Sequence, residues 1–192
     1  MKKLTHDEIS KNRSTLETLH KVKKLPVYVV LNSIRSNYNV GSIFRTSDGV
    51  MIEKLYLCGY TPHPPKPALY LQSEKPLAGK KEILKTALGS TESVKWEYVK
   101  DAKGVILKLK SEGIKICALE MTNKSIPYYR IKKEDFPLCV IVGNEITGVS
   151  QELIDLCDFS IEIPQYGIKQ SLNVAVAYGV MIFELRKVFD LK

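Results

Sequence analysis

Short apolar runs alternate along the chain with longer segments in which apolar residues recur at helical spacing. Runs typical of buried strands occupy residues 27–31, 55–58, 96–99, 114–119, 138–142 and 159–163. Helical patterns lie between or after them, around residues 39–46, 105–109, 150–157 and 172–188. Strands that alternate with helices predict an α/β fold, with a mostly parallel sheet covered by helices on both faces.

The first 25 residues have a different pattern from the rest. Thr5 and Glu8 have the spacing of a capping box, and a thin apolar stripe follows them, so a helix is predicted over residues 4–24. Pro26 is expected to end it. We therefore expect a helical extension over residues 1–25, followed by one domain over residues 26–192.

Residues 59–81 carry no regular pattern and are expected to form an irregular loop. Four prolines between Thr61 and Pro67 are incompatible with a helix or a central strand. A loop of this length in a compact domain is usually functional or mobile.

Composition excludes several classes of protein. The 192 residues are 44% hydrophobic and 26% charged, which is typical of a globular domain. No apolar run is long enough to span a bilayer, and the start of the chain turns acidic where a signal peptide would be apolar. A cytoplasmic protein without a membrane partner is expected. Four scattered cysteines and three separated histidines predict neither a disulfide framework nor a metal site.

The formal net charge of +8 is compatible with a polyanionic partner. The lysines are spread along the chain, however, and there are no arginine-rich tracts. A solvated basic surface explains the charge equally well, so charge alone does not identify a nucleic-acid-binding protein.

Three polar turns that follow predicted strands are the candidate chemical sites, because ligands of parallel sheets bind beyond the carboxyl ends of the strands. The first polar turn, residues 37–46, holds Asn39 as a candidate N-cap and Gly41 as a point of close approach. Arg45 lies six residues after Asn39, which is nearly two helical turns. Its alternative is a surface ion pair with Asp48 or Glu53.

The second polar turn, residues 143–150, follows the strand at 138–142 directly. Gly143 and Gly148 bracket it, which lets the backbone approach a ligand. Asn144 and Glu145 lie between these glycines, and a carboxylate there needs a hydrogen-bonding or cationic partner. The alternative role of Glu145 is to cap the helix predicted at 150–157.

The third polar turn, residues 163–174, leads from Ile163 and Pro164 into the last helix. Ser171 is a plausible N-cap for that helix. Asn173 precedes a run of apolar residues, and its amide needs a partner if it is buried. The glycine-rich and catalytic signatures of dinucleotide-binding proteins, phosphate loops, acyl hydrolases and metalloproteases are absent from the sequence.

Taken together, the three turns resemble the motifs of the SpoU (TrmH-like) branch of the SPOUT RNA methyltransferases, over residues 26–185. The motif residues are Asn39-Val40-Gly41-Ser42-Ile43-Phe44-Arg45-Thr46, Val142-Gly143-Asn144-Glu145-Ile146-Thr147-Gly148-Val149, and Ile163-Pro164 with Gly167 and Ser171-Leu172-Asn173-Val174. The segments 58–62 and 85–89 also look like those of a subgroup of small family members.

The resemblance implies a sheet whose C-terminal part forms a deep trefoil knot, a homodimer, and S-adenosylmethionine as methyl donor without a metal. It places the cofactor near Leu119, Glu120, Gly143, Ile163 and Leu172. It assigns the active site to Arg45, Glu145, Ser171 and Asn173, with Asn39 and Asn144 binding RNA or shaping the site. The implied reaction is methylation of a ribose 2′-hydroxyl of tRNA or rRNA.

Within this family, an arginine has been viewed as the base that activates the ribose hydroxyl. A guanidinium stays protonated, so we interpret Arg45 as a phosphate clamp that stabilises the developing alkoxide. Ser171 and Asn173 would orient the hydroxyl, and Glu145 would hold Arg45 or Asn39.

Several points stay open at the level of sequence. A separate N-terminal RNA-binding domain like that of many rRNA-modifying relatives is not expected, which favours tRNA or another small exposed site. The loop with Tyr70 and several lysines is expected either to contact RNA or to be solvated and mobile. Two other functions are compatible with the resemblance: an RNA-binding protein that has lost catalysis, and a SPOUT enzyme that methylates a base.

Overall fold

Seven strands form one sheet in the computed structural model, which describes residues 1–65 and 78–191. The strands are β1 (Leu25–Asn32), β2 (Ile52–Cys58), β3 (Trp96–Val99), β4 (Lys115–Leu119), β5 (Ile126–Pro127), β6 (Leu138–Val142) and β7 (Phe159–Glu162). Their order in the sheet is β3-β2-β1-β6-β4-β7-β5, and every strand pair is parallel. The predicted parallel α/β sheet is confirmed.

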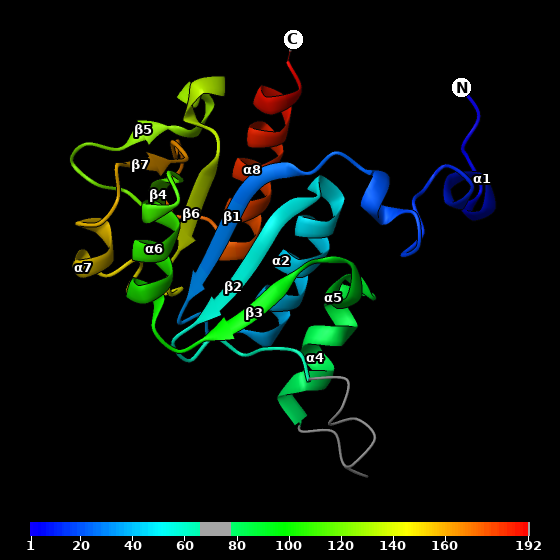
Figure 1. Ribbon diagram of the computed structural model, residues 1–192, viewed down its shortest axis with the longest axis horizontal. Coiled ribbons are helices and arrows are strands. Elements are labelled where there is room, and N and C mark those ends of the chain that lie inside the picture. The colour runs from blue at the N-terminus through cyan, green and yellow to red at the C-terminus, as the bar shows by residue number, and fades with distance from the viewer. Residues whose placement is uncertain (66–77, 192) are drawn as a thin grey trace.

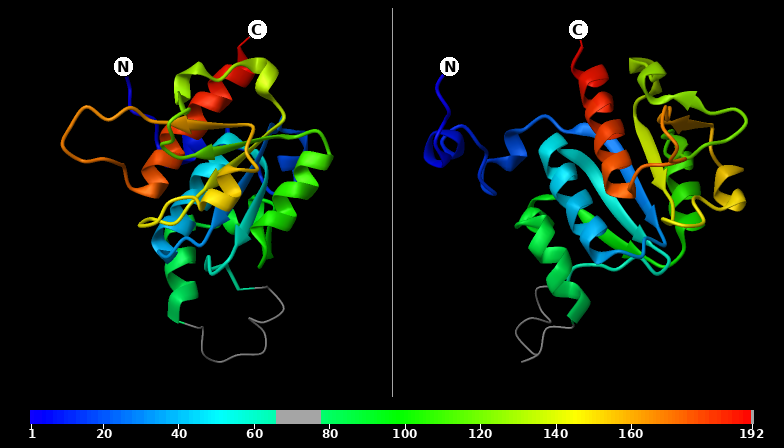
Figure 2. Two further views of the ribbon diagram at one scale, coloured as in Figure 1. Left: turned by 90° about the vertical axis from the view of Figure 1, so that its left-hand side faces the viewer. Right: turned by 180° about the vertical axis from the view of Figure 1, so that it is seen from behind.

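Helices cover both faces of this sheet (Figures 1 and 2). The helices are α1 (His6–Ser10), α2 (Asn37–Val50), α4 (Ala78–Ala87), α5 (Ser90–Ser93), α6 (Ala102–Ser111), α7 (Gln151–Ile154) and α8 (Val174–Asp190). Short 3-10 helices occupy Leu19–Lys21, Tyr128–Arg130 and Lys133–Asp135. Helices α2, α4 and α8 pack on one face, whereas α6 and α7 lie on the other. In the described part of the chain, no helix has the length and apolar character needed to cross a membrane.

The strand β1 illustrates why the core has two halves. Successive side chains of a strand point to opposite faces, so Val29 and Leu31 belong to the α2 and α8 side, and Val30 belongs to the α6 side. All three are fully buried. The central strands are therefore apolar on both faces, as expected for a parallel sheet between two helical layers.

Helix α8, near the C-terminus, packs against α2, which lies in the first third of the sequence. The Tyr178 hydroxyl and the Ser47 hydroxyl form a buried hydrogen bond of 2.7 Å between the two helices. The beginnings of the two helices also meet, where the Asn173 amide donates a hydrogen bond to the Asn39 side-chain oxygen, and this contact places the third polar turn beside the first.

The N-terminal prediction of one helix over residues 4–24 is wrong. The capping box of Thr5 and Glu8 is confirmed, but α1 ends at Ser10, and a 3-10 helix at Leu19–Lys21 is the next regular element. Pro26 lies inside β1. Leu16 stays 61% exposed, so the thin apolar stripe has no surface to pack on, and a short helix without packing is marginal in water. The segment that carries α1 projects away from the sheet (Figure 1).

The loop prediction for residues 59–81 extends too far at its C-terminal end. Helix α4 begins at Ala78, and Ile83 anchors it in the core. The expected contacts of Tyr70 lie outside the described residues.

Candidate active site

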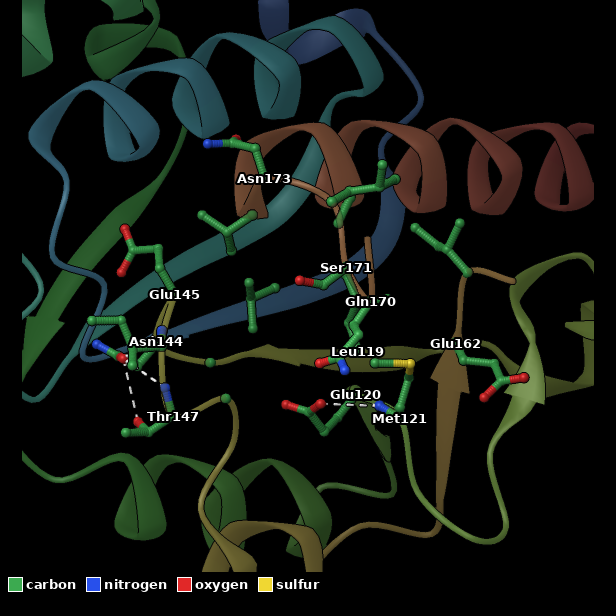
Figure 3. A pocket seen from close by; sticks show the side chains of 18 of the residues that line it. Leu119, Glu120, Met121, Asn144, Glu145, Thr147, Glu162, Gln170, Ser171 and Asn173 are labelled. Carbon is green, nitrogen blue, oxygen red and sulfur yellow. Dashed lines mark hydrogen bonds between the residues drawn. The ribbon is translucent and has the colours of Figure 1, made fainter. Parts of the chain in front are cut away.

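A cavity of about 370 Å³ opens beyond the carboxyl ends of β4, β6 and β7 (Figure 3). Its walls come from three loops, at residues 119–121, 142–148 and 161–174, and from Ala177 of α8. Loops beyond the carboxyl ends of parallel strands are where such sheets bind ligands. The second and third polar turns therefore form two of the walls.

Asn144 shapes the second polar turn. Its side-chain oxygen accepts hydrogen bonds from the backbone of Ile146 at 2.9 Å and of Thr147 at 3.0 Å. Its amide nitrogen donates to the Ser33 carbonyl oxygen at 2.8 Å and to the Tyr60 hydroxyl at 2.6 Å. Asn144 is only 7% exposed, and it ties the turn after β6 to the turns after β1 and β2.

Two glycines let the same turn fold tightly. A Cβ atom on Gly143 would collide with the backbone of Gly148 and Val149. Gly148 has a φ of 68° and packs against the Glu120 carboxylate. That carboxylate accepts hydrogen bonds from the backbone N–H groups of Val149 at 2.9 Å and Met121 at 3.0 Å. Glu120 thus joins the loop after β4 to the loop after β6.

The Glu145 carboxylate binds the beginning of α2. It accepts hydrogen bonds from the backbone N–H groups of Arg35 at 2.8 Å and Ser36 at 3.1 Å, and from the Asn39 amide at 3.0 Å. Partial burial raises the pKa of Glu145, but these hydrogen bonds outweigh it and hold the pKa below the ordinary value of 4.5. Glu145 is therefore an ionised acceptor, and it does not cap α7.

Asn39 extends this contact to the third polar turn. Its side-chain oxygen accepts a hydrogen bond from the Asn173 amide at 3.2 Å. The Asn173 oxygen in turn accepts from the backbone of Ala175 at 2.9 Å and of Val176 at 3.4 Å. Glu145, Asn39 and Asn173 thus form a hydrogen-bonded chain that joins all three polar turns.

Two capping predictions are corrected. Ser36 is the N-cap of α2, and its hydroxyl accepts from the Asn39 N–H, whereas Asn39 itself lies inside the helix. Asn173 is the N-cap of α8, in place of Ser171. Asn173 is exposed, whereas the sequence had left open that it is buried. Its side-chain amide is nevertheless hydrogen-bonded, to Asn39 and to the first turn of α8.

Arg45 does not line the cavity. Its side chain is exposed on α2 and, within the described residues, forms no hydrogen bond or ion pair. The alternative surface pairs are not formed: Asp48 accepts a hydrogen bond from Ser93, and Glu53 pairs with Lys24 at 3.1 Å. Of the two partners expected for Glu145, the structure brings Asn39 to it and not Arg45.

All the other candidate residues except Asn39 line the cavity. Its lining includes all five residues expected near a cofactor, together with Asn144, Glu145, Ser171 and Asn173: the five are Leu119, Glu120, Gly143, Ile163 and Leu172. The cavity also has a polar wall that was not predicted, formed by Glu162, Gln165 and Gln170. Their only sequence signal was their place within or beside the third polar turn.

The cysteines are small buried residues, as expected. Cys58, Cys117 and Cys139 are buried, Cys157 is half-buried, and all four are free thiols. Burial raises the pKa of Cys157 to about 11 and that of Cys58 to about 12. Across the described residues no cluster of His, Cys, Asp or Glu side chains could hold a metal ion.

Known proteins are similar in sequence to this chain over most of its length. Residues 26–183 match the model of the SpoU rRNA Methylase family. A tRNA (guanosine(18)-2'-O)-methyltransferase of Aquifex aeolicus is 30% identical over 174 residues, which are 89% of this chain and 73% of the relative. Several longer relatives come from staphylococci and Escherichia coli, and the chain spans 58–63% of their length.

Solved structures share the fold. The TrmH/SpoU tRNA modifying enzyme of A. aeolicus has a TM-score of 0.71 at 28% identity and covers 90% of this chain and 81% of its own. An AdoMet-bound rRNA methyltransferase of Sinorhizobium meliloti has a TM-score of 0.71 at 25% identity, with 88% and 59% covered. The matched family model, the relatives and the shared fold show that the chain belongs to the SpoU rRNA methylase family of RNA methyltransferases.

Proposed function

We propose that the protein transfers a methyl group from S-adenosylmethionine to a ribose 2′-hydroxyl of tRNA or rRNA. The observation that carries the proposal is the hydrogen-bonded chain of Glu145, Asn39 and Asn173 at the wall of the cavity. The names of the A. aeolicus relative and of the AdoMet-bound neighbour support the reaction and the donor.

The size and the lining of the cavity support S-adenosylmethionine as its ligand. Its volume lies within the range of about 300–1,000 Å³ that is usual for small-molecule pockets. Leu119, Ile163 and Leu172 offer an apolar surface, and Gly143 also lines the cavity. When bound, the cofactor supplies an electrophilic methyl group on a sulfonium.

The hydrogen-bonded chain fixes the polar rim of the cavity. Each amide of Asn39 and Asn173 is oriented, because its oxygen accepts from one partner and its nitrogen donates to another. Ser171 lines the same rim, and its exposed side chain is available to a ribose hydroxyl. These residues position the acceptor, and positioning alone can contribute several powers of ten in rate.

Arg45 serves the RNA rather than the cofactor in this proposal. Its guanidinium is permanently charged and uncommitted among the described residues, so it can clamp a phosphate and stabilise the developing alkoxide. The ribose hydroxyl must lose one proton during the reaction. A neighbouring phosphate or water takes that proton, since neither Arg45 nor the ionised, fully engaged Glu145 is suited to do so.

A homodimer belongs to the same proposal, as does the trefoil knot that the family resemblance implies. Helix α8 supports the homodimer with a stripe of exposed apolar residues at helical spacing, Val176, Val180 and Phe183. A second copy of this chain is the proposed occupant of that stripe. Light scattering tests the homodimer. We expect the wild type to be a dimer and Phe183→Glu to be a monomer.

Calorimetric titration with S-adenosylmethionine tests the cofactor site. The wild type is expected to bind, and Leu172→Asp to lose binding, because a carboxylate enters the apolar wall. Leu107→Asp is the matched control, since Leu107 is an exposed leucine on α6 that does not line the cavity. Absence of heat and of a thermal shift with the wild type would favour the alternative of a binding protein without catalysis. A base-methylating enzyme would bind the cofactor equally well and is separated from the proposal by its product.

A further inference from the structure

Tyr60 presents an aromatic ring to solvent beside the wall of the cavity. It is 63% exposed and follows the end of β2. Its hydroxyl oxygen accepts a hydrogen bond from the Asn144 amide at 2.6 Å. Asn144 and Glu145 both line the cavity, so the ring lies beside the turn that carries the ionised carboxylate.

The backbone before Tyr60 is fixed from two sides. Gly59 donates its N–H to the Lys100 carbonyl oxygen at 3.1 Å, and its own carbonyl oxygen accepts from the Tyr98 hydroxyl at 2.9 Å. Gly59 has a φ of 63°, and a side chain there would collide with Ser33. The chain therefore reaches Tyr60 in one defined direction.

The backbone after Tyr60 is fixed as well. Thr61 is 2% exposed, and its hydroxyl donates to the Leu31 carbonyl oxygen at 2.9 Å and accepts from the Ile34 N–H at 3.0 Å. With both flanking residues and the hydroxyl held, the Tyr60 ring loses little freedom when a ligand packs on it. A rigid, exposed aromatic ring is suited to binding, because ordering costs reduce affinity.

Two cations lie on the segments that hold this ring. Arg35 supplies one of the N–H groups bound to Glu145, and Lys100 supplies the carbonyl oxygen bound to Gly59. Both side chains are exposed, and neither forms an ion pair within residues 1–65 and 78–191. Aromatic rings flanked by cations are typical of sites for single-stranded nucleic acids, which stack their bases and bind through their phosphates.

We propose that Tyr60 is a stacking platform for an unpaired nucleobase of the RNA, next to the nucleotide that is methylated. The inference rests on the proposed function and extends it, because it assigns a base contact to a residue outside the three polar turns. The Tyr60 oxygen accepts from Asn144, and within the described residues the phenolic hydrogen has no acceptor of its own. The hydroxyl stays with Asn144 and takes no part in the proposed base contact.

Three variants separate the ring from its hydroxyl. Tyr60→Ala removes the ring, whereas Tyr60→Phe keeps the ring and removes only the hydrogen bond with Asn144. Tyr129→Ala is the matched control, since Tyr129 is 50% exposed and does not line the cavity. The binding probe is a fluorescein-labelled, single-stranded RNA of mixed sequence and about 12 nucleotides, within the range of known single-strand site sizes. S-adenosylhomocysteine is kept at saturation, and its own affinity is measured by calorimetry.

Tyr60→Ala is expected to weaken RNA binding about tenfold, the effect of losing one stacked base. Tyr60→Phe and Tyr129→Ala are expected to bind RNA as the wild type does, and the affinity for S-adenosylhomocysteine is expected to stay unchanged in all three. Equal RNA affinity of Tyr60→Ala and the wild type would overturn the stacking site alone. Equal losses in Tyr60→Ala and Tyr60→Phe would assign the effect to the Asn144 contact and also overturn it. If the wild type bound the cofactor product but no RNA, the RNA substrate of the proposed function would fail as well.

Discussion

The amide nitrogen of Asn173 donates a hydrogen bond to the side-chain oxygen of Asn39 at 3.2 Å, across 134 residues of sequence. This contact joins the N-terminal turns of α2 and α8. The amide nitrogen of Asn39 donates a further hydrogen bond to the Glu145 carboxylate. We expect Glu145, Asn39 and Asn173 to act as one positioning unit, so removing any one of them should disturb the other two.

A double-mutant cycle tests that unit. Asn173→Ser keeps an oxygen that can cap α8, but it is too short to reach Asn39, so stability should change by less than about 0.5 kcal/mol. Methyl transfer should fall about 10- to 100-fold, because the acceptor is misplaced. Asn39→Ala should give a similar loss, and the double variant no more than either single one. Additive losses in kcat would show that the two residues act independently.

Gly143 should tolerate no side chain. Gly143→Ala places a methyl group against the backbone of Gly148 and Val149, and we expect it to cost about 1–3 kcal/mol and to lower the affinity for S-adenosylmethionine. Gly167→Ala is the control, because a Cβ atom there meets nothing within 4 Å. Urea unfolding and calorimetry measure the two effects. Wild-type binding and stability of Gly143→Ala would contradict the tight second turn.

Arg45→Ala should separate turnover from cofactor binding. Arg45 does not line the cavity, so the affinity for S-adenosylmethionine should be unchanged, whereas kcat should fall about 100- to 1,000-fold. Arg45→Lys keeps the charge but not the planar fork, and an intermediate kcat is expected. The assigned role is wrong if Arg45→Ala keeps wild-type turnover at saturating RNA and cofactor.

Asp158 should make the stability of the protein depend on acid pH. Burial raises its pKa, but the N–H of Ile116 at 2.8 Å and the ammonium of Lys110 at 2.9 Å outweigh burial and lower the pKa below the ordinary value of 3.8. A lowered pKa stabilises the fold above the unfolded value, and this contribution is lost as the pH falls through the folded value. Asp158→Asn should therefore be less stable than the wild type in urea at neutral pH, and the difference should shrink below about pH 3.8. A difference independent of pH would contradict this role.

The sheet was predictable from the sequence because its strands are apolar on both faces. The run Leu138–Val142 is predicted with the bounds that the structure has, because a short continuous apolar run that ends at a glycine is typical of a fully buried strand. The two residues of Ile126–Pro127 are too short to show any pattern. The helix predicted over residues 4–24 failed for a tertiary reason, the lack of a surface on which its stripe could pack.

The sequence indicated which residues belong to the candidate site better than it indicated which of them contact each other. Asn39, Glu145 and Asn173 are recognisable as polar residues in turns after strands, but their pairing depends on the packing of α8 against α2. The capping assignments failed because Ser36 and Asn39, like Ser171 and Asn173, are all good caps, and only backbone geometry decides between them. Tyr60 lies in the segment 58–62 that resembles a subgroup of the family, but no role could be assigned to it, since its exposure and its bond to Asn144 arise from tertiary structure.

The atom that receives the methyl group decides whether the protein is a ribose 2′-O-methyltransferase. RNA from cells that lack the gene is incubated with the purified protein and isotopically labelled S-adenosylmethionine, digested to nucleosides, and analysed by mass spectrometry, with Arg45→Ala as the control. With the wild type we expect the label in one 2′-O-methylated nucleoside, and with Arg45→Ala we expect it to be strongly reduced. Label on a nucleobase, or no transfer by a protein that binds the cofactor and RNA, would contradict the proposed function.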